Sequence, residues 1–247
     1  MDLGIAGKRA AVAASSGGLG RGIALALGQA GCEVVVSGRD ADRLATAAAD
    51  VANSHPITAD VSTVEGALAF VEDARTELGG IDILVTNGGG PPPGTFASTP
   101  WEDYQPAIER SLLAMAAMVH ECVPAMRENQ WGRVLAITSV SVRQPIPNLI
   151  LSNTARAGLT GFLKTVALEV AGDGITVNTI QPGLHATDRV QQIYGGDTSG
   201  AAAAIPVGFV GDPDDFGRAG AFLCSESAKF ITGASLNVDG GTYSALQ

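Results

Sequence analysis

Short apolar runs alternate with longer amphipathic segments along almost the whole chain. The short runs are rich in β-branched residues and carry apolar side chains at successive positions, which is typical of strands buried on both faces. These runs are Arg9–Ala14, Glu33–Ser37, His55–Thr58, Ile83–Asn87, Arg133–Thr138, Thr176–Ile180 and Ser235–Val238.

The segments between the runs repeat their apolar positions with a helical period. They are Leu19–Ala30, Asp40–Val51, Thr63–Leu78, Tyr104–Met126, Leu151–Ala171 and a last helix that begins at Asp212-Pro213. Seven strands that alternate with six helices predict an α/β fold: a single-domain, Rossmann-type, doubly wound parallel sheet with helices on both faces.

Length and composition narrow the class of protein. A chain of 247 residues with 46% hydrophobic and 16% charged residues predicts one globular domain over residues 1–247. The net charge of -10 argues against nucleic acid as a partner, because such proteins carry basic surfaces. No apolar run reaches the ~18 residues of a membrane span. Cys32, Cys122 and Cys224 have no disulfide or metal-ligand spacing, which predicts a cytoplasmic protein without a metal site.

A glycine-rich turn follows the first predicted strand, where residues 14–20 read ASSGGLG. Glycines let the backbone approach a pyrophosphate, and the N-terminus of the following helix supplies oriented N–H groups. The candidate cofactor-binding residues here are Ala14, Ser16, Gly18, Leu19 and Gly20. Taken alone, the pattern also fits an ordinary strand-to-helix turn.

The end of the second strand carries the signal for cofactor choice. An acidic residue there would bind the adenosine ribose hydroxyls of NAD, but Gly38 leaves room for a 2′-phosphate and Arg39 offers it a guanidinium. This pair predicts NADP(H) in preference to NAD(H), and the alternative is a solvated Arg39 that opens a helix. The carboxyl ends of the next two strands add the candidates Asp60, Val61, Asn87 and Gly88.

Together, in this order and spacing, the motifs resemble the short-chain dehydrogenase/reductase family, in particular the 3-oxoacyl-acyl-carrier-protein reductases. The matching pieces are the glycine-rich turn, Asp60-Val61, Asn87-Gly88-Gly89, Ile137-Thr138-Ser139, Val177-Asn178, Pro182-Gly183 with Thr187, and Ile231-Thr232-Gly233 leading to Val238-Asp239-Gly240-Gly241. The resemblance covers essentially the whole chain and adds Pro182, Gly183 and Thr187 to the expected cofactor site. One departure is Ala14, which stands where the family has its first glycine.

The resemblance also implies a catalytic set of Asn, Ser, Tyr and Lys, in which the tyrosine gives a proton to the substrate oxygen as hydride arrives. Carried over by position, these residues are Ser111, Ser139, Ser152 and Arg156. No tyrosine of this chain is followed by a lysine four residues later, so the motif is not displaced. A serine hydroxyl is a poor acid and a guanidinium does not release a proton. Ser152 and Arg156 still share one helix face, where they can address one ligand.

The replacement proton donors are few. His185 follows Pro182-Gly183, in a segment of about residues 184–211 that we expect to form a substrate lid, and its ordinary pKa suits proton transfer. Tyr194 lies in the same segment, and a water molecule is the other source. The alternative for both side chains is a local contact within the lid.

The sequence therefore favours an atypical NADP(H)-dependent oxidoreductase acting on a small carbonyl or alcohol. Ser139 and Ser152 would donate hydrogen bonds to the substrate oxygen, while Arg156 would hold the ribose and stabilise charge. The alternatives are non-redox chemistry on the same scaffold, such as elimination, isomerisation or cyclisation, and a cofactor-binding protein with little activity. The wide apolar faces of helices 104–126 and 151–171 predict a homodimer or homotetramer.

Overall fold

All seven predicted strands are present and form one parallel sheet, which confirms the expected fold class. The computed structural model describes residues 2–188, 190 and 197–246. The strands are β1 (Arg9–Val12), β2 (Glu33–Gly38), β3 (Ser54–Thr58), β4 (Ile83–Thr86), β5 (Gly132–Ile137), β6 (Ile175–Pro182) and β7 (Ser235–Val238). Their order in the sheet is β3-β2-β1-β4-β5-β6-β7. Because every neighbouring pair is parallel, all the carboxyl ends meet at one edge of the sheet.

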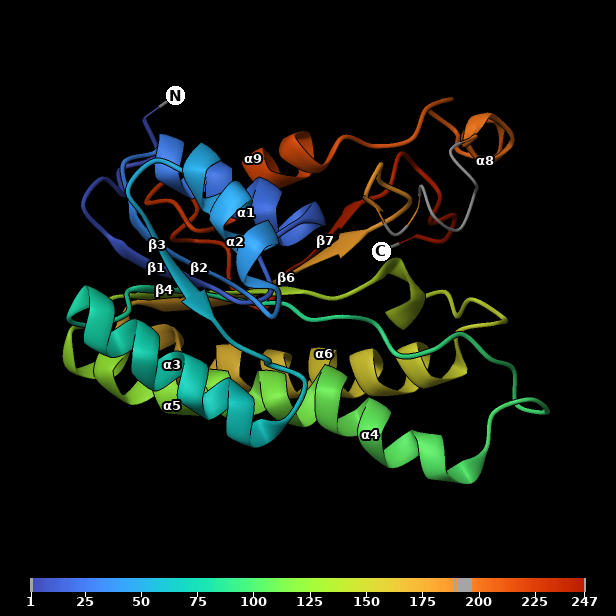
Figure 1. The fold of residues 1–247 in the computed structure, drawn as a ribbon, viewed down its shortest axis with the longest axis horizontal. Coiled ribbons are helices and arrows are strands. Elements are labelled where there is room, and N and C mark those ends of the chain that lie inside the picture. The colour runs from blue at the N-terminus through green and yellow to red at the C-terminus, as the bar shows by residue number, and fades with distance from the viewer. Residues whose placement is uncertain (1, 189, 191–196, 247) are drawn as a thin grey trace.

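Helices cover both faces of the sheet (Figure 1). One layer consists of α1 (Gly18–Gln29), α2 (Ala41–Asp50) and α9 (Pro213–Leu223). The other consists of α3 (Val64–Leu78), α4 (Tyr104–Ile108), α5 (Ala114–Glu128) and α6 (Ile150–Val170). Shorter elements are α8 (Ser199–Ala203), the 3₁₀ segments η1 (Trp101–Asp103), η3 (Val140–Val142) and η4 (Ala171–Asp173), and the π-helical turn η2 (Glu109–Leu113).

Each helical layer encloses its own apolar core against the sheet. Leu27 and Phe216 are fully buried in the core beneath α1, α2 and α9. Phe70 and Met118 are fully buried in the core of the opposite layer. Burial of one such side chain contributes about 1.5–3 kcal/mol. No helix within the described residues is both long and apolar enough to cross a membrane.

The predicted helix Tyr104–Met126 is present but contains a π-helical turn that the sequence did not indicate. The π-helical turn η2 separates α4 from α5 and contains Ser111. Such turns insert an extra residue into an α-helix and are frequent at functional sites. The buried residues Ala107, Ser111 and Met115 are each four positions apart across the turn, so the apolar period of the sequence does not reveal it. The other helices and strands begin and end within one or two residues of the predicted positions.

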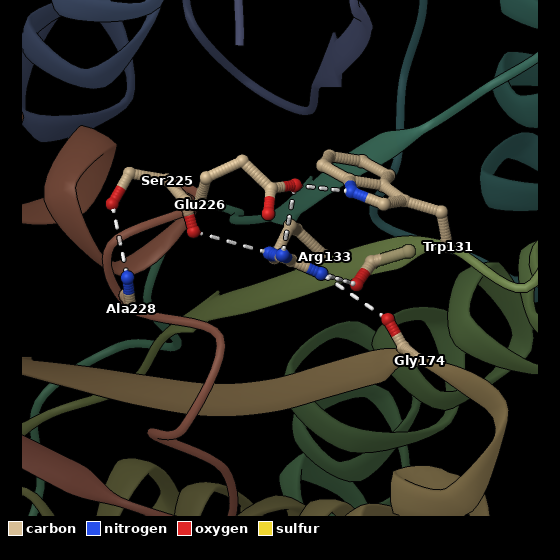
Figure 2. A network of polar contacts seen from close by, with 7 residues as sticks. Trp131, Arg133, Gly174, Ser225, Glu226 and Ala228 are labelled. Atoms are coloured by element: carbon tan, nitrogen blue, oxygen red, sulfur yellow. Dashed lines mark hydrogen bonds and ion pairs between the residues drawn. The ribbon is translucent and has the colours of Figure 1, made fainter. Parts of the chain in front are cut away.

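A buried arginine occupies the amino end of β5, opposite the edge where the strands finish (Figure 2). Arg133 is only 2% exposed. Its guanidinium donates to the carbonyls of Gly132 (2.8 Å), Gly174 (3.2 Å) and Ser225 (3.4 Å) and pairs with the carboxylate of Glu226 at 3.4 Å. Burial lowers the pKa of Arg133. Three backbone carbonyls and one carboxylate surround the charge, so this end of the sheet holds a structural hydrogen-bond network.

Glycines allow α1 and α9 to pack unusually closely. A Cβ atom on Gly22 would overlap the carbonyl of Pro213, and one on Gly217 would overlap the carbonyl of Gly22. The two helices therefore meet backbone to backbone. Since α1 begins at the carboxyl edge of the sheet, this contact helps to fix the position of its N-terminus.

We expect Gly217→Ala to lower the free energy of unfolding by at least ~2 kcal/mol, because the new methyl group forces the two backbones apart. Chemical denaturation followed by circular dichroism measures the change. Gly172→Ala is the matched control, because a Cβ there meets nothing within 4 Å. A loss of stability in the control as large as that in Gly217→Ala would contradict the packing explanation.

Candidate functional site

One cleft of about 1040 Å³ lies at the carboxyl edge of the sheet. It is formed by the residues that follow β1, β2, β3, β4, β5 and β6 and by the first turns of α6. Most of the predicted site residues line it: Ala14, Ser16, Gly18, Leu19, Arg39, Asp60, Val61, Asn87, Gly88, Ser139, Ser152, Arg156, Pro182 and Thr187. The structure thus brings the expected cofactor residues and three of the expected catalytic residues into one continuous space.

The glycine-rich turn leaves the N-terminus of α1 open toward the cleft. The N-cap residue, Gly17, has no side chain to bond the first N–H groups of the helix. Gly20 lets the helix sit close to the end of β1, because a Cβ there would lie 2.7 Å from both the Ala14 carbonyl oxygen and Asn87 Nδ2. Uncapped N–H groups at the positive end of a helix dipole favour an anion such as a pyrophosphate.

Ala14 adopts a backbone conformation that favours glycine, with a φ of 48°. Its N–H donates to Ser37 Oγ at 3.0 Å, and its carbonyl accepts from Asn87 Nδ2 at 3.0 Å. These two hydrogen bonds hold Ala14 in the left-handed region despite its methyl group. Both anchoring partners lie at ends of neighbouring strands, so the departure from glycine leaves the turn in place at the cost of local strain.

Gly38 has no space for a side chain. A Cβ on Gly38 would lie 2.5 Å from Ser16 Oγ and 2.6 Å from Ser16 Cβ. An aspartate at this position therefore could not coexist with the present Ser16 conformation. Arg39 follows, with its side chain 72% exposed in the cleft and Nη1 4.0 Å from Asp60 Oδ2.

Two serines and one arginine define the other part of the cleft. Ser139 caps η3, and its Oγ accepts from the Ser141 N–H at 3.1 Å. Ser152 and Arg156 project from the first turns of α6. Arg156 Nη1 donates to the carbonyls of Ile137 (2.8 Å) and Thr138 (3.2 Å), which anchors the guanidinium at the end of β5. All three side chains line the cleft and carry hydrogen-bond donors.

Among the described residues that line the cleft, the ionisable side chains are all arginines or aspartates. They are Arg39, Arg43, Arg110, Arg156, Asp40, Asp60 and Asp188. Ser111, expected at the family's asparagine position, is 2% exposed and outside this lining, and its Oγ has no hydrogen-bond partner in the described part of the chain. The described lining therefore contains charged and hydroxyl groups but no histidine, tyrosine, lysine or cysteine.

The structure does not place His185 in the cleft, which corrects the expectation that it faces the substrate. The ring is 4% exposed, packs edge-on against Phe216 at 5.0 Å, and has Nδ1 3.2 Å from the Gly183 carbonyl oxygen. Gly211 is also close to the ring, because a Cβ there would lie 2.7 Å from His185 Cδ2. Burial lowers the pKa of His185. The sequence around His185 reads as a loop and does not indicate that the ring is buried. For that reason His185 was a candidate proton donor.

Other predicted residues support the cleft without lining it or lie beyond what is described. Gly183 follows β6 and must be small, because a Cβ there would lie 2.7 Å from Asp239 Cα. His185 and Gly211 form a bridge that ties together the two ends of the predicted lid. Tyr194 lies outside the described residues. The lid at about residues 184–211 stays a prediction.

Arg43, Arg110 and Asp188 line the cleft but were not among the sequence candidates. Arg43 lies four residues after Arg39, which was an available signal for a second cation at the same end of the cleft. Arg43 pairs with Asp188 at 2.9 Å, although 145 positions separate them in the chain. No local pattern indicates a contact over that separation.

A cleft at the carboxyl edge of a doubly wound parallel sheet is the usual place for a ligand in this class of fold. The family model described as enoyl-(acyl carrier protein) reductase matches residues 13–243. The chain therefore belongs to the short-chain dehydrogenase/reductase family of oxidoreductases, as its motifs predict.

Individual relatives match along nearly their whole length. The chain is 33% identical over 239 residues to the 3-oxoacyl-acyl-carrier-protein reductase of Escherichia coli (strain K12), covering 96% of this chain and 98% of the relative. It is 33% identical over 241 residues to nodulation protein G of Azospirillum brasilense, with coverages of 95% and 97%. The L-sorbose reductase of Gluconobacter frateurii, solved with NADPH and L-sorbose, superposes with a TM-score of 0.92 at 33% identity over 100% of both chains.

We expect Ala14→Gly to raise the free energy of unfolding by ~0.5–1 kcal/mol, because glycine adopts the left-handed region without strain. Thermal and chemical denaturation measure the gain. Ala13→Gly is the matched control. Ala13 is next to Ala14 but is fully buried and has no positive φ, so the same substitution should lower the free energy of unfolding there. A loss at position 14 would show that the methyl group contributes more by packing than it costs in strain.

Proposed function

We propose that this protein is an NADP(H)-dependent oxidoreductase that acts on a small carbonyl or alcohol compound with an unusual set of catalytic side chains. The observation that carries the proposal is the continuity of one cleft from the glycine-rich turn and Arg39 to Ser139, Ser152 and Arg156. A dinucleotide and a small substrate fit such a space end to end. Membership of an oxidoreductase family supports the same reading.

The residues present fit NADP(H) at the adenosine end. The N-terminus of α1 would hold the pyrophosphate, and the exposed guanidinium of Arg39 would pair with the 2′-phosphate. Ser16 supports this choice, because its side chain fills the position that an NAD-selecting carboxylate would need. When bound, the nicotinamide supplies or accepts a hydride. NADPH in the superposed sorbose reductase is consistent with this assignment.

The side chains at the reaction end suit the binding of a negatively charged oxygen. Ser139 and Ser152 would each donate a hydrogen bond to the substrate oxygen. Arg156 would add positive charge and contact the ribose, and its anchoring to the Ile137 carbonyl holds the guanidinium in a fixed orientation. Preorganised donors of this kind stabilise charge that develops during a reaction. Because Arg156 keeps its proton, the proton that completes reduction would come from water.

A second candidate is reduction of a carbon–carbon double bond conjugated to a carbonyl group. The described lining contains no ionisable proton donor besides carboxyl and guanidinium groups, and the matching family model is described as an enoyl reductase. Hydride addition to the β-carbon moves an electron pair to the carbonyl oxygen and gives an enolate, which is less basic than an alkoxide. Ser139, Ser152 and Arg156 would stabilise that oxygen, while water protonates the α-carbon.

Self-association through helices 104–126 and 151–171 stays part of the proposal. Leu113 and Leu168 lie on these helices and are 46% and 73% exposed. Large apolar side chains exposed on neighbouring helices are typical of subunit contacts.

Titration of the purified protein with NADPH and NADH, followed by fluorescence, tests the cofactor assignment. We expect Arg39→Asp to weaken NADPH binding about tenfold or more, because a charge-assisted hydrogen bond is lost and a like charge faces the phosphate. Binding of NADH should change little. An unchanged preference in Arg39→Asp would remove Arg39 from the cofactor site, and no binding of either nucleotide by the wild type would overturn the proposed function.

The double variant Ser152→Tyr with Arg156→Lys tests the reaction end. If the scaffold lacks only a proton donor, ketone reduction measured by NADPH oxidation should rise about 10²-fold, within the range of general acid catalysis. Ser152→Phe with Arg156→Lys is the matched control, since it adds the ring without the hydroxyl. Wild-type turnover of a conjugated enone but not of the matching saturated ketone, with no gain in the double variant, would favour the second candidate.

A further inference from the structure

Arg43 lies against the glycine-rich turn although it belongs to α2. Its Nη2 atom is 3.2 Å from the position that a Cβ on Gly17 would take. Gly17 follows Ser16, whose side chain abuts Gly38 at the end of β2. The two arginines that follow β2, Arg39 and Arg43, therefore reach the same end of the cleft, and both line it.

The partner of Arg43 comes from a distant segment. Asp188 Oδ2 lies 2.9 Å from Arg43 Nη2, and the two side chains are 73% and 57% exposed. Asp188 follows Thr187, whose methyl group lies 3.3 Å from the position of a Cβ on Gly18. The carboxylate thus reaches Arg43 across the glycine-rich turn, from the chain that leaves β6.

The Arg43–Asp188 pair is easy to replace. An exposed ion pair contributes ~0–1 kcal/mol, because water screens both charges. A phosphate monoester carries a charge of about -1.5 to -2 near pH 7 and offers three acceptor oxygens. A phosphate at this end of the cleft would therefore compete well against the single carboxylate for the guanidinium of Arg43.

We propose that Arg43 is a second ligand of the cofactor's 2′-phosphate and that Asp188 is an internal competitor for it. Binding of the phosphorylated cofactor exchanges the carboxylate for the phosphate, and binding of NAD(H) leaves the ion pair intact. The choice between the two cofactors thus depends on Asp188 as well as on the cations. The inference rests on the proposed NADP(H) site and assigns two further specificity-determining residues to it.

The competition predicts opposite effects for the two partners. Arg43→Gln should raise the dissociation constant of NADP⁺ about tenfold, because one charged hydrogen bond is lost, and leave that of NAD⁺ unchanged. Asp188→Asn should lower the dissociation constant of NADP⁺ about two- to fivefold, because the competitor is removed, again without effect on NAD⁺. In the double variant the gain from Asp188→Asn should vanish.

Isothermal titration calorimetry of the full chain with NADP⁺ and NAD⁺ measures all of these constants at one ionic strength. Asp215→Asn and Arg218→Gln are the matched controls, because Asp215 and Arg218 form an exposed ion pair on α9 that does not line the cleft. They change the net charge equally and should leave both constants unaltered.

Several results would overturn the inference. If Asp188→Asn weakens NADP⁺ and NAD⁺ alike, the pair closes over the common pyrophosphate instead of competing for the 2′-phosphate. If the gain from Asp188→Asn persists without Arg43, the carboxylate acts only by long-range charge.

Arg39→Gln separates this inference from the proposed function. If Arg39→Gln abolishes the preference for NADP⁺ while the Arg43 and Asp188 variants have no effect, only the inference fails. If the wild type binds both nucleotides equally and Arg39→Gln changes nothing, the 2′-phosphate site fails as well.

Discussion

The close approach of α1 to the strand ends and to α9 is the constraint on which the cleft depends. A side chain at Gly20 would collide with the carbonyl oxygen of Ala14, in the turn after β1. A side chain at Gly22 would collide with the carbonyl oxygen of Pro213. The helix can therefore lie directly over the carboxyl end of β1, with its uncapped N-terminus at the edge where all the strands finish. If α1 lay further from the sheet, the glycine-rich turn would no longer face the residues that follow β4 and β5. Backbone contacts, more than side-chain chemistry, thus create the half of the cleft for which we propose nucleotide binding.

The electrostatics of the cleft differ from those of the whole molecule. The chain carries a net charge of -10, yet four arginines line the cleft. Two of them face carboxylates across it, Arg39 at 4.0 Å from Asp60 and Arg43 at 2.9 Å from Asp188. These exposed pairs keep the cations near the cleft while contributing little stability of their own. Because Asp40, Asp60 and Asp188 also line the cleft, the four arginines leave only a small positive excess there.

The sequence predicted the layered fold well because buried parallel strands and amphipathic helices have distinct periods. It also located most of the cleft, since residues at the carboxyl ends of parallel strands converge wherever the sheet is doubly wound. Three features were beyond it. The burial of His185 depends on Phe216 and Gly211. The left-handed conformation of Ala14 depends on hydrogen bonds from two other strand ends. The pair of Arg43 and Asp188 joins segments whose proximity only the finished fold determines.

The fold also explains how residues at the predicted reaction end can change while the framework of the cleft is kept. Ser152 and Arg156 occupy a partly exposed face of α6, whereas the helix is held to the sheet by buried residues such as Leu151, Ala155 and Leu159. Side chains on the cleft face can change without removing any part of the apolar core. Gly20 in the glycine-rich turn and Gly38 at the end of β2 have no such freedom, because side chains there would meet neighbouring atoms at 2.7 Å or less. The fold therefore tolerates changes at Ser152 and Arg156 more readily than changes at these two glycines.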